Sequence, residues 1–335
     1  MKKLLFNTAF LIAGLLSISH AIAQQDENEK KETFKFNKSK SYSKSYSISG
    51  GDKIYLDNQF GEMKLVIWDK NEIKVDVSIT AKSDDEAEAQ EILERITIED
   101  RKESGAVYYK TKMSNEKPSW EGKKGNHHQS MEINYIVYLP TGNPLKAANQ
   151  FGKMIVPDYR GEAEVSSKFG SLTAGKFSNA KEISVEFGNA NIAEVSGGKL
   201  SIKFSNGTVN KLSGDVKANL EFSKVKLEID NSVKTLTINN SYAEVYLDAD
   251  KNFSATYDIT STHGEFTNQS SFAISKQGEK ENRYGPEFTK RYSGTSGSGS
   301  AKIKISSSFG ETIIGHDLKV DMTEKKKKAK NIRTV

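Results

Sequence analysis

A phenylalanine that recurs every 17 or 18 residues is the feature that most constrains how this 335-residue chain can fold. It stands in the tetrads NQFG, SKFG, VEFG, IKFS and LEFS, at Phe151, Phe169, Phe187, Phe204 and Phe222. Tyr242 continues the series, and the same motif occurs near the two ends around Phe60 and Phe309. A fixed period of this length indicates a repeat architecture, in which each unit stacks on the next.

Single apolar residues alternate with polar ones inside each repeat, and turn residues interrupt them at regular intervals. The residues three positions after each ring are Met154, Leu172, Ala190, Gly207, Val225 and Val245, of which only Gly207 fits poorly. Such alternation is typical of short, half-buried strands. We therefore predict an all-β fold, a single-chain β-solenoid (a β-helix) with coils of about 18 residues over residues 141–316. We expect the rings to stack in an internal structural ladder made of Phe151, Phe169, Phe187, Phe204, Phe222 and Tyr242.

The residues before the repeat predict a cap, because the open end of a stack of strands recruits other chains unless it is covered. Alternating apolar residues predict strands from Ile54 to Ile79 and at 96–98, 106–109 and 133–139. Between them we predict one short helix from Ser83 to Arg95, with Ser83 as N-cap and Glu86 completing a capping box. Residues 46–140 thus form a β-rich N-terminal cap with one helix, and residues 253–316, where the period loosens, cover the other end.

The two ends of the chain predict export and a disordered tail. Lys2 and Lys3 precede an apolar run, and Ala21-Ile22-Ala23 supplies the small residues of a cleavage site, so residues 1–23 predict a signal peptide that is cleaved after Ala23. The apolar run is shorter than the roughly 20 residues of a spanning helix, so we expect no transmembrane segment in the mature chain. We expect the protein in the periplasm, on the cell surface or in the extracellular medium. Residues 24–45 predict a flexible leader, and residues 317–335, with four successive lysines from Lys325, a basic tail.

Composition narrows the function classes further. The chain contains no cysteine, which leaves no disulfide, no lipid attachment at cysteine and no thiolate chemistry. The formal charge of +5 includes Lys2 and Lys3, so the mature chain carries 5 − 2 = +3 with both signs interspersed. We therefore predict no nucleic-acid partner.

The loop at residues 114–130 holds the candidate ligand-binding residues. Trp120, with Lys123 and Lys124 nearby, can stack on a sugar ring or hold an acidic glycan. The alternative is a tryptophan folded back onto the cap. His127 and His128 are adjacent and point to opposite faces of a strand, so we predict no metal site, and no other cofactor is expected.

No catalytic residues are predicted. An enzyme built on a β-helix needs carboxylates that converge on one face of adjacent coils. Glu186 and Glu221 precede their ring whereas Glu244 follows its own, so the three do not share a repeat position. We therefore predict that the protein is not an enzyme.

Structural motifs extend over residues 46–316: the Asn58-Gln59-Phe60-Gly61 opening, Trp68-Asp69 before the Ile73-Val75-Val77 strand, the acidic helix at 84–94, the Tyr138-Leu139-Pro140 entry and the Phe-Gly coils. On these motifs the chain resembles the putative-adhesin family of exported bacterial β-solenoid proteins, a domain of unknown function. The resemblance implies a non-catalytic, adhesin-like binding or scaffold protein of the bacterial cell envelope that presents repetitive polar faces to a glycan or an envelope protein.

Two alternatives remain. One is a carbohydrate-active β-helix enzyme, which stacked acids in a cleft would indicate. The other is an envelope signalling accessory with a membrane-protein partner, and an exposed apolar patch would indicate a protein partner of this kind.

Overall fold

The computed structural model describes residues 33–121, 128–278 and 288–322. The predicted signal peptide, the first part of the predicted leader and most of the basic tail lie outside these residues, as do Lys123, Lys124 and His127. No helix among the described residues is long and apolar enough to cross a membrane.

The described chain is all-β with a single helix, and its 21 strands form one open sheet. The strands before the repeat are β1 (Phe36–Ser47), β2 (Lys53–Gln59), β3 (Met63–Ile67), β4 (Glu72–Ser83), β5 (Ile96–Glu103), β6 (Ala106–Met113) and β7 (Gln129–Leu139), with α1 (Glu86–Glu94) after β4. The repeat comprises β8 (Leu145–Gln150), β9 (Lys153–Val156), β10 (Tyr159–Lys168), β11 (Ser171–Glu186), β12 (Asn189–Lys203), β13 (Asn206–Glu221), β14 (Lys224–Ser241) and β15 (Glu244–Ala249). The last strands are β16 (Ala255–Thr262), β17 (Glu265–Gln269), β18 (Ala273–Lys276), β19 (Thr289–Ser296), β20 (Ala301–Ser308) and β21 (Glu311–Gly315). The predicted all-β class is confirmed.

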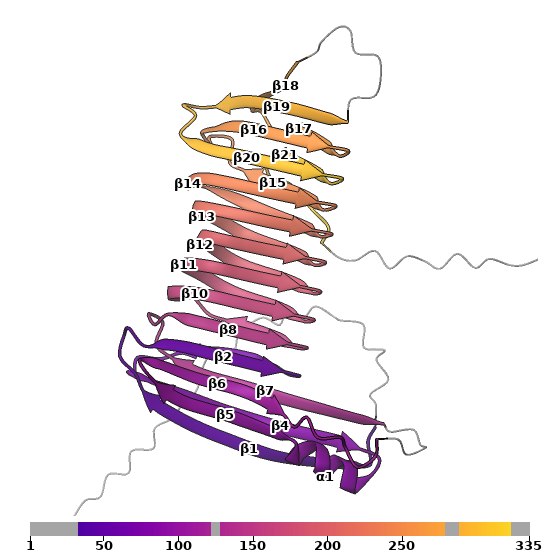
Figure 1. The fold of residues 1–335 in the computed structure, drawn as a ribbon. Helices are drawn as coiled ribbons and strands as arrows, with labels where there is room; N and C mark the ends of the chain where they lie inside the picture. The colour runs from indigo at the N-terminus through magenta and orange to yellow at the C-terminus, as the bar shows by residue number, and fades with distance from the viewer. Residues whose placement is uncertain (1–32, 122–127, 279–287, 323–335) are drawn as a thin grey trace, which may run out of the picture. The chain divides into compact units, whose positions relative to one another are not determined.

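Successive repeats pair side by side in parallel (Figure 1). Each long strand consists of two arms separated by a bend. In β11 the first arm is 171–177 and the second arm is 182–186, and each pairs with the corresponding arm of β12. The register keeps like positions together, since Val185 aligns with Ile202 and Ile202 aligns with Leu220. Stacking of this kind lets the inward residues of one repeat pack on those of the next.

The core is a single cluster of alternating apolar residues from both arms, and it runs from Ile48 to Ile314. Most of these side chains are aliphatic, and the largest fully buried ones in the repeat are Tyr159 and Phe177. Because apolar area removed from water stabilises a fold by about 25 cal/mol per Å², this continuous cluster accounts for cohesion without disulfides.

The Phe-Gly dipeptides form the corners between one repeat and the next. The ring residues adopt φ values from 48 to 62°, a left-handed conformation that L-residues adopt at a cost. The following glycines lie against each other, and a Cβ added at Gly188 would stand 1.8 Å from the carbonyl oxygen of Gly170. At later corners a serine replaces glycine, and the Gly188 N–H donates to Ser205 Oγ at 3.0 Å. The dipeptide thus reflects a corner where adjacent backbones touch.

The N-terminal cap differs from the prediction at its beginning. Residues 36–45, which we expected in the flexible leader, belong to β1, which pairs antiparallel with β4. The hydroxyls of Tyr42 and Tyr46 both donate to the carboxylate of Asp100, with 2.5 Å from Tyr42 Oη to Asp100 Oδ1. These two bonds and the pairing with β4 hold a strand whose polar sequence had suggested disorder.

The helix is present, but Ser83 is not its N-cap. Ser83 ends β4, and α1 begins at Glu86 with Asp85 as N-cap, because the Asp85 carboxylate accepts from the Glu88 N–H at 3.0 Å. The Ser83 hydroxyl instead accepts from the Asp85 N–H at 3.2 Å. An acidic side chain suits this position because the helix N-terminus carries partial positive charge.

The order of strands along the stack departs from their order in the chain at both ends (Figure 1). Strand β2 lies between β6 and β8, although β6 follows it by some fifty residues in the sequence. Strand β20 lies between β14 and β16, although it follows both. The antiparallel strands β19 and β18 then cover β16. At each end of the repeat, therefore, one strand is inserted out of chain order, β2 at one end and β20 at the other.

Candidate functional site

The corner rings form one continuous stack along the surface, which we call the aromatic ridge. Neighbouring rings have centroids 4.8–5.1 Å apart, and the planes of all but the last pair lie within 10° of parallel. In order along the stack the ridge consists of Phe60, Phe151, Phe169, Phe187, Phe204, Phe222, Tyr242, Phe309, His263 and Phe288.

The ladder is external, so the prediction of an internal ladder was wrong. The six rings expected inside are between 43 and 51% exposed. The reason is the left-handed backbone conformation at each corner, which interrupts the alternation of the arms and directs the ring away from the core. The inward positions belong to residues two places before the ring, such as Val185 and Ile202.

Stacking decides what the ridge can bind. The two faces of an inner ring contact the rings on either side, so the outward surface consists of ring edges. A sugar that stacks on an aromatic residue needs the face of the ring, and only the terminal rings leave a face uncovered. The ridge is therefore a narrow apolar strip rather than a row of sugar platforms.

Charged residues beside the ridge alternate in sign. The residues immediately before four consecutive rings are Lys168, Glu186, Lys203 and Glu221, which we call the shoulder. Within it Lys168 Nζ lies 2.9 Å from a Glu186 carboxylate oxygen, and Lys203 Nζ lies 2.7 Å from one of Glu221. The shoulder thus carries no net charge.

Other carboxylates on the repeat are also paired with lysines. The hydrogen bonds from Lys181 and then Lys146 lower the pKa of Glu164 below its ordinary value. Those from Ser232 lower the pKa of Asp230 in the same direction, with a further contribution from Lys211. Glu244, singled out in the sequence, lies 3.7 Å from Lys224.

A second surface feature is a neutral polar column on the second arms of the later repeats. Asn219 aligns with Asn239, Asn239 with Ser306, and Ser306 with Thr260. The Asn239 amide donates to the Asn219 side-chain oxygen at 2.9 Å. We call these four residues the polar column. Amides and hydroxyls at the regular spacing of a sheet can bond to a flat, hydroxyl-rich partner.

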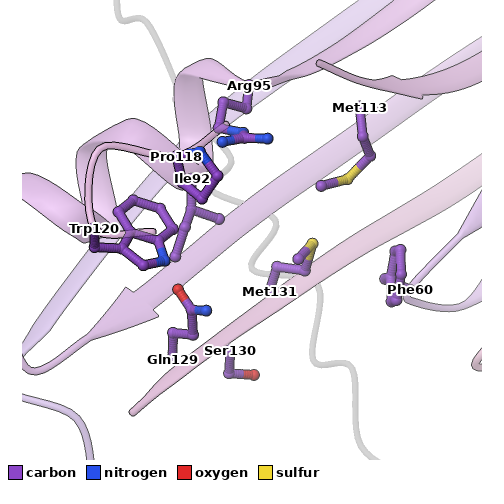
Figure 2. A pocket seen from close by; sticks show the side chains of 9 residues that line it. All are labelled: Phe60, Ile92, Arg95, Met113, Pro118, Trp120, Gln129, Ser130 and Met131. Carbon is purple, nitrogen blue, oxygen red and sulfur yellow. The ribbon is translucent and has the colours of Figure 1, made fainter. Parts of the chain in front are cut away.

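An apolar pocket of about 420 Å³ lies beside the first ring of the ridge (Figure 2). The residues that line it come from α1, the ends of β2, β6 and β7 and the segment before Glu121: Phe60, Ile92, Arg95, Met113, Pro118, Trp120, Gln129, Ser130 and Met131. The Arg95 guanidinium stands at its edge, where it donates to the carbonyl oxygens of Ser114, at 3.0 Å, and Glu116. These backbone bonds and the neighbouring Glu91, at 3.9 Å, occupy much of the guanidinium.

Trp120 is buried in the wall of this pocket with 9% of its surface exposed, which corresponds to the alternative of a tryptophan folded onto the cap. Lys123 and Lys124 lie outside the described residues, so the ligand site that groups them with Trp120 stays a prediction. His128 stacks on Phe34 at 4.3 Å and lies 3.4 Å from Asp84. Within the described part of the chain, no three His, Cys, Asp or Glu side chains are grouped so as to hold a metal ion.

Comparison with known proteins gives distant structural likeness only. A putative cell adhesion protein from Clostridium sporogenes is 17% identical, with 83% of this chain and 100% of that one covered and a TM-score of 0.24. A putative adhesin from Bacteroides fragilis is 11% identical, with 83% and 97% covered and a TM-score of 0.35. A putative lipid binding protein from Parabacteroides distasonis is 13% identical, with 82% and 94% covered and a TM-score of 0.33.

No protein-family model matches the sequence, and no curated protein matches it. Likeness at this level assigns neither an activity nor a ligand.

Proposed function

We propose that this protein is a non-catalytic, adhesin-like binding or scaffold protein of the bacterial cell envelope, whose repeats form a β-solenoid that presents the same outward chemistry coil after coil. The observation that carries the proposal is the in-register repetition of outward side chains, in the ridge, in the shoulder and in the polar column. Repetition suits a partner that is itself long or repetitive. Catalysis needs a different arrangement, in which a few groups converge at one point.

The carboxylates support the non-catalytic reading. The acids expected to matter in a carbohydrate-active β-helix, Glu186 and Glu221, are paired with the lysine of an adjacent coil. Their charge is compensated by a lysine, whereas glycoside hydrolysis requires a pair of carboxylates that act together.

A glycan is the partner that the polar column fits. Its members are neutral, which matches sugar hydroxyls better than the paired Lys and Glu side chains found elsewhere on the repeat. Successive strands lie about 4.8 Å apart, so an extended chain crossing the column meets a hydrogen-bonding group at each coil. The ridge contributes little to such binding because its ring faces are covered.

The test is a glycan-array screen of the purified protein and two matched variants. Asn239→Lys places a charged side chain in the polar column, and Asn191→Lys makes the same substitution at an exposed position of a first arm, in β12. We expect a neutral glycan to bind the wild type and Asn191→Lys, and binding to fall at least about tenfold in Asn239→Lys. Equal binding by all three proteins would remove the polar column as the site, and no binding to any glycan would leave a protein partner as the function to pursue.

A second candidate is a scaffold that binds a protein, and the ridge favours it. Contiguous exposed apolar surface marks sites of protein–protein contact. The ridge is such a surface: most of its rings are phenylalanines, its polar groups are the Tyr242 hydroxyl and the His263 imidazole, and it holds no cluster of positive charge for an anionic ligand.

A further inference from the structure

The area of the aromatic ridge is large enough for a protein interface. Its eight most exposed rings are 43–57% exposed. Since an aromatic side chain has roughly 200 Å² of surface, these rings together expose roughly 800 Å² of apolar edge. The largest apolar patch of an ordinary monomer is about 300–600 Å², and one partner of a standard protein interface contributes about 800 Å². The ridge alone therefore supplies what one side of a stable interface needs.

The backbone at the ridge adds a second argument. Nine of its ten residues have positive φ, although none of them is the glycine or asparagine that adopts this conformation with the least strain. Aromatic residues at corner after corner therefore carry a conformational cost in the isolated chain. Residues held in such conformations concentrate at sites with a function beyond folding.

The charges beside the ridge discriminate between partners. An anionic lipid surface attracts clustered lysines, whereas the shoulder alternates Lys168, Glu186, Lys203 and Glu221 and has no net charge. The same alternation suits a second copy of this chain. When one copy is reversed against another, a register exists in which each shoulder lysine faces a shoulder glutamate, and the ring spacings of 4.8–5.1 Å match because they are the same.

We propose that the aromatic ridge is the contact surface of a homodimer, in which two copies of this chain lie antiparallel with their ridges in contact along their length. Such an interface is isologous, because the same surface of each copy faces its counterpart across a two-fold axis. This inference goes beyond the proposed function, because the homodimer does not depend on glycan binding by the polar column. The glycan array tests the proposed function, and the experiments below test the homodimer.

The chain contains no cysteine, so a single introduced thiol reports the arrangement. In the antiparallel register that pairs the shoulder charges, the two-fold axis passes between Phe187 and Phe204, so only thiols at these two corners lie close to their own counterparts. We expect Phe187→Cys or Phe204→Cys to form a disulfide-linked dimer roughly a hundredfold faster than Phe60→Cys at the end of the ridge, because only the central thiols are held together. Ile136→Cys, at a 40% exposed residue of β7 off the ridge, sets the rate of random collision.

The second measurement is the oligomeric state of proteins that carry no introduced cysteine, determined by sedimentation. We expect a dimer at about 10 µM, and at least a hundredfold weaker dimerisation in the double variant Phe187→Asn/Phe204→Asn, whose asparagines fit the left-handed corners and keep the monomer folded. Ile136→Asn, checked for folding in the same way by circular dichroism, should dimerise as the wild type does. A wild type that is monomeric at about 100 µM would overturn the proposal. Cross-linking of Phe204→Cys that is no faster than that of Ile136→Cys would also overturn it. So would a monomeric wild type that binds phosphatidylcholine vesicles when the double variant does not.

Discussion

Two phenylalanines of adjacent repeats offer a direct test of how the fold distributes its stability. Phe177 lies in the first arm of β11 with 1% of its surface exposed, and Phe204 lies on the ridge with 44% exposed. Removing the Phe177 ring in Phe177→Ala exposes roughly 200 Å² of buried apolar surface, worth about 5 kcal/mol at 25 cal/mol per Å². Because partial collapse of the site reduces the loss, we expect Phe177→Ala to lower the free energy of unfolding by about 3–5 kcal/mol.

Phe204→Asn should cost much less. Slightly more than half of the Phe204 side chain is buried, roughly 110 Å², so the loss of burial is about 3 kcal/mol. Asparagine relieves about 1 kcal/mol of strain at a corner where φ is 49°. The expected net loss is therefore about 2 kcal/mol, less than for Phe177→Ala.

The assay is urea unfolding followed by circular dichroism, with both variants and the wild type at one protein concentration low enough that all three are monomeric. A loss for Phe204→Asn that equals or exceeds the loss for Phe177→Ala would refute the reasoning. It would mean that the ridge is held for stability by ring stacking and that its exposed edges need no partner. A loss below about 1 kcal/mol for Phe177→Ala would contradict the assignment of the core.

Two further predictions concern the corners and the charges. Gly188→Ala should lower the free energy of unfolding by at least about 2 kcal/mol, because its Cβ meets the carbonyl oxygen of the adjacent corner. The control is Gly142→Ala, whose Cβ meets no atom within 4 Å. It should change the free energy of unfolding by less than about 0.5 kcal/mol in the same urea titration. Lys181→Gln should make the free energy of unfolding fall less steeply as the pH is lowered. Hydrogen bonds from Lys181 and then Lys146 lower the pKa of Glu164, so this carboxylate stabilises the fold at pH values above its ordinary pKa of 4.5. That contribution is lost as the pH falls through the lower folded-state pKa. The wild type should therefore lose more stability than Lys181→Gln between pH 7 and pH 3, and parallel pH profiles would contradict the role of Lys181.

The all-β class could be predicted from sequence because it depends on local patterns. Alternation with a period of two and a corner every 17 or 18 residues are both visible in the chain. The orientation of the rings could not be read in the same way. We extended the alternation through the corner and placed the rings inside, whereas the sign of φ at that residue decides the direction. The glycine after Phe60, Phe151, Phe169, Phe187 and Phe309 was the available signal, since it marks a close backbone approach rather than a strand interior.

The polar strand β1 and the polar column were missed for a different reason. The sequence around Tyr42 and Tyr46 is rich in serine and lysine and resembles a leader, and the strand depends on β4 and on Asp100, which are distant in the chain. The column depends on which repeats become neighbours, and Ser306 reaches Asn239 only because β20 inserts beside β14. Contacts of this kind lack a local signal.

The insertion of β20 and β21 also sets an order of events for a chain that emerges from the ribosome. Repeats up to β14 can add to the growing sheet as they are made, but β16 has its parallel neighbour only after β20 has been synthesised and has entered between them. Until then the edge of β14 offers free backbone groups to any extended chain nearby. A chain truncated between Ser296 and Ala301 would lack β20 and β21, and its β14 edge would stay open to pairing with other chains.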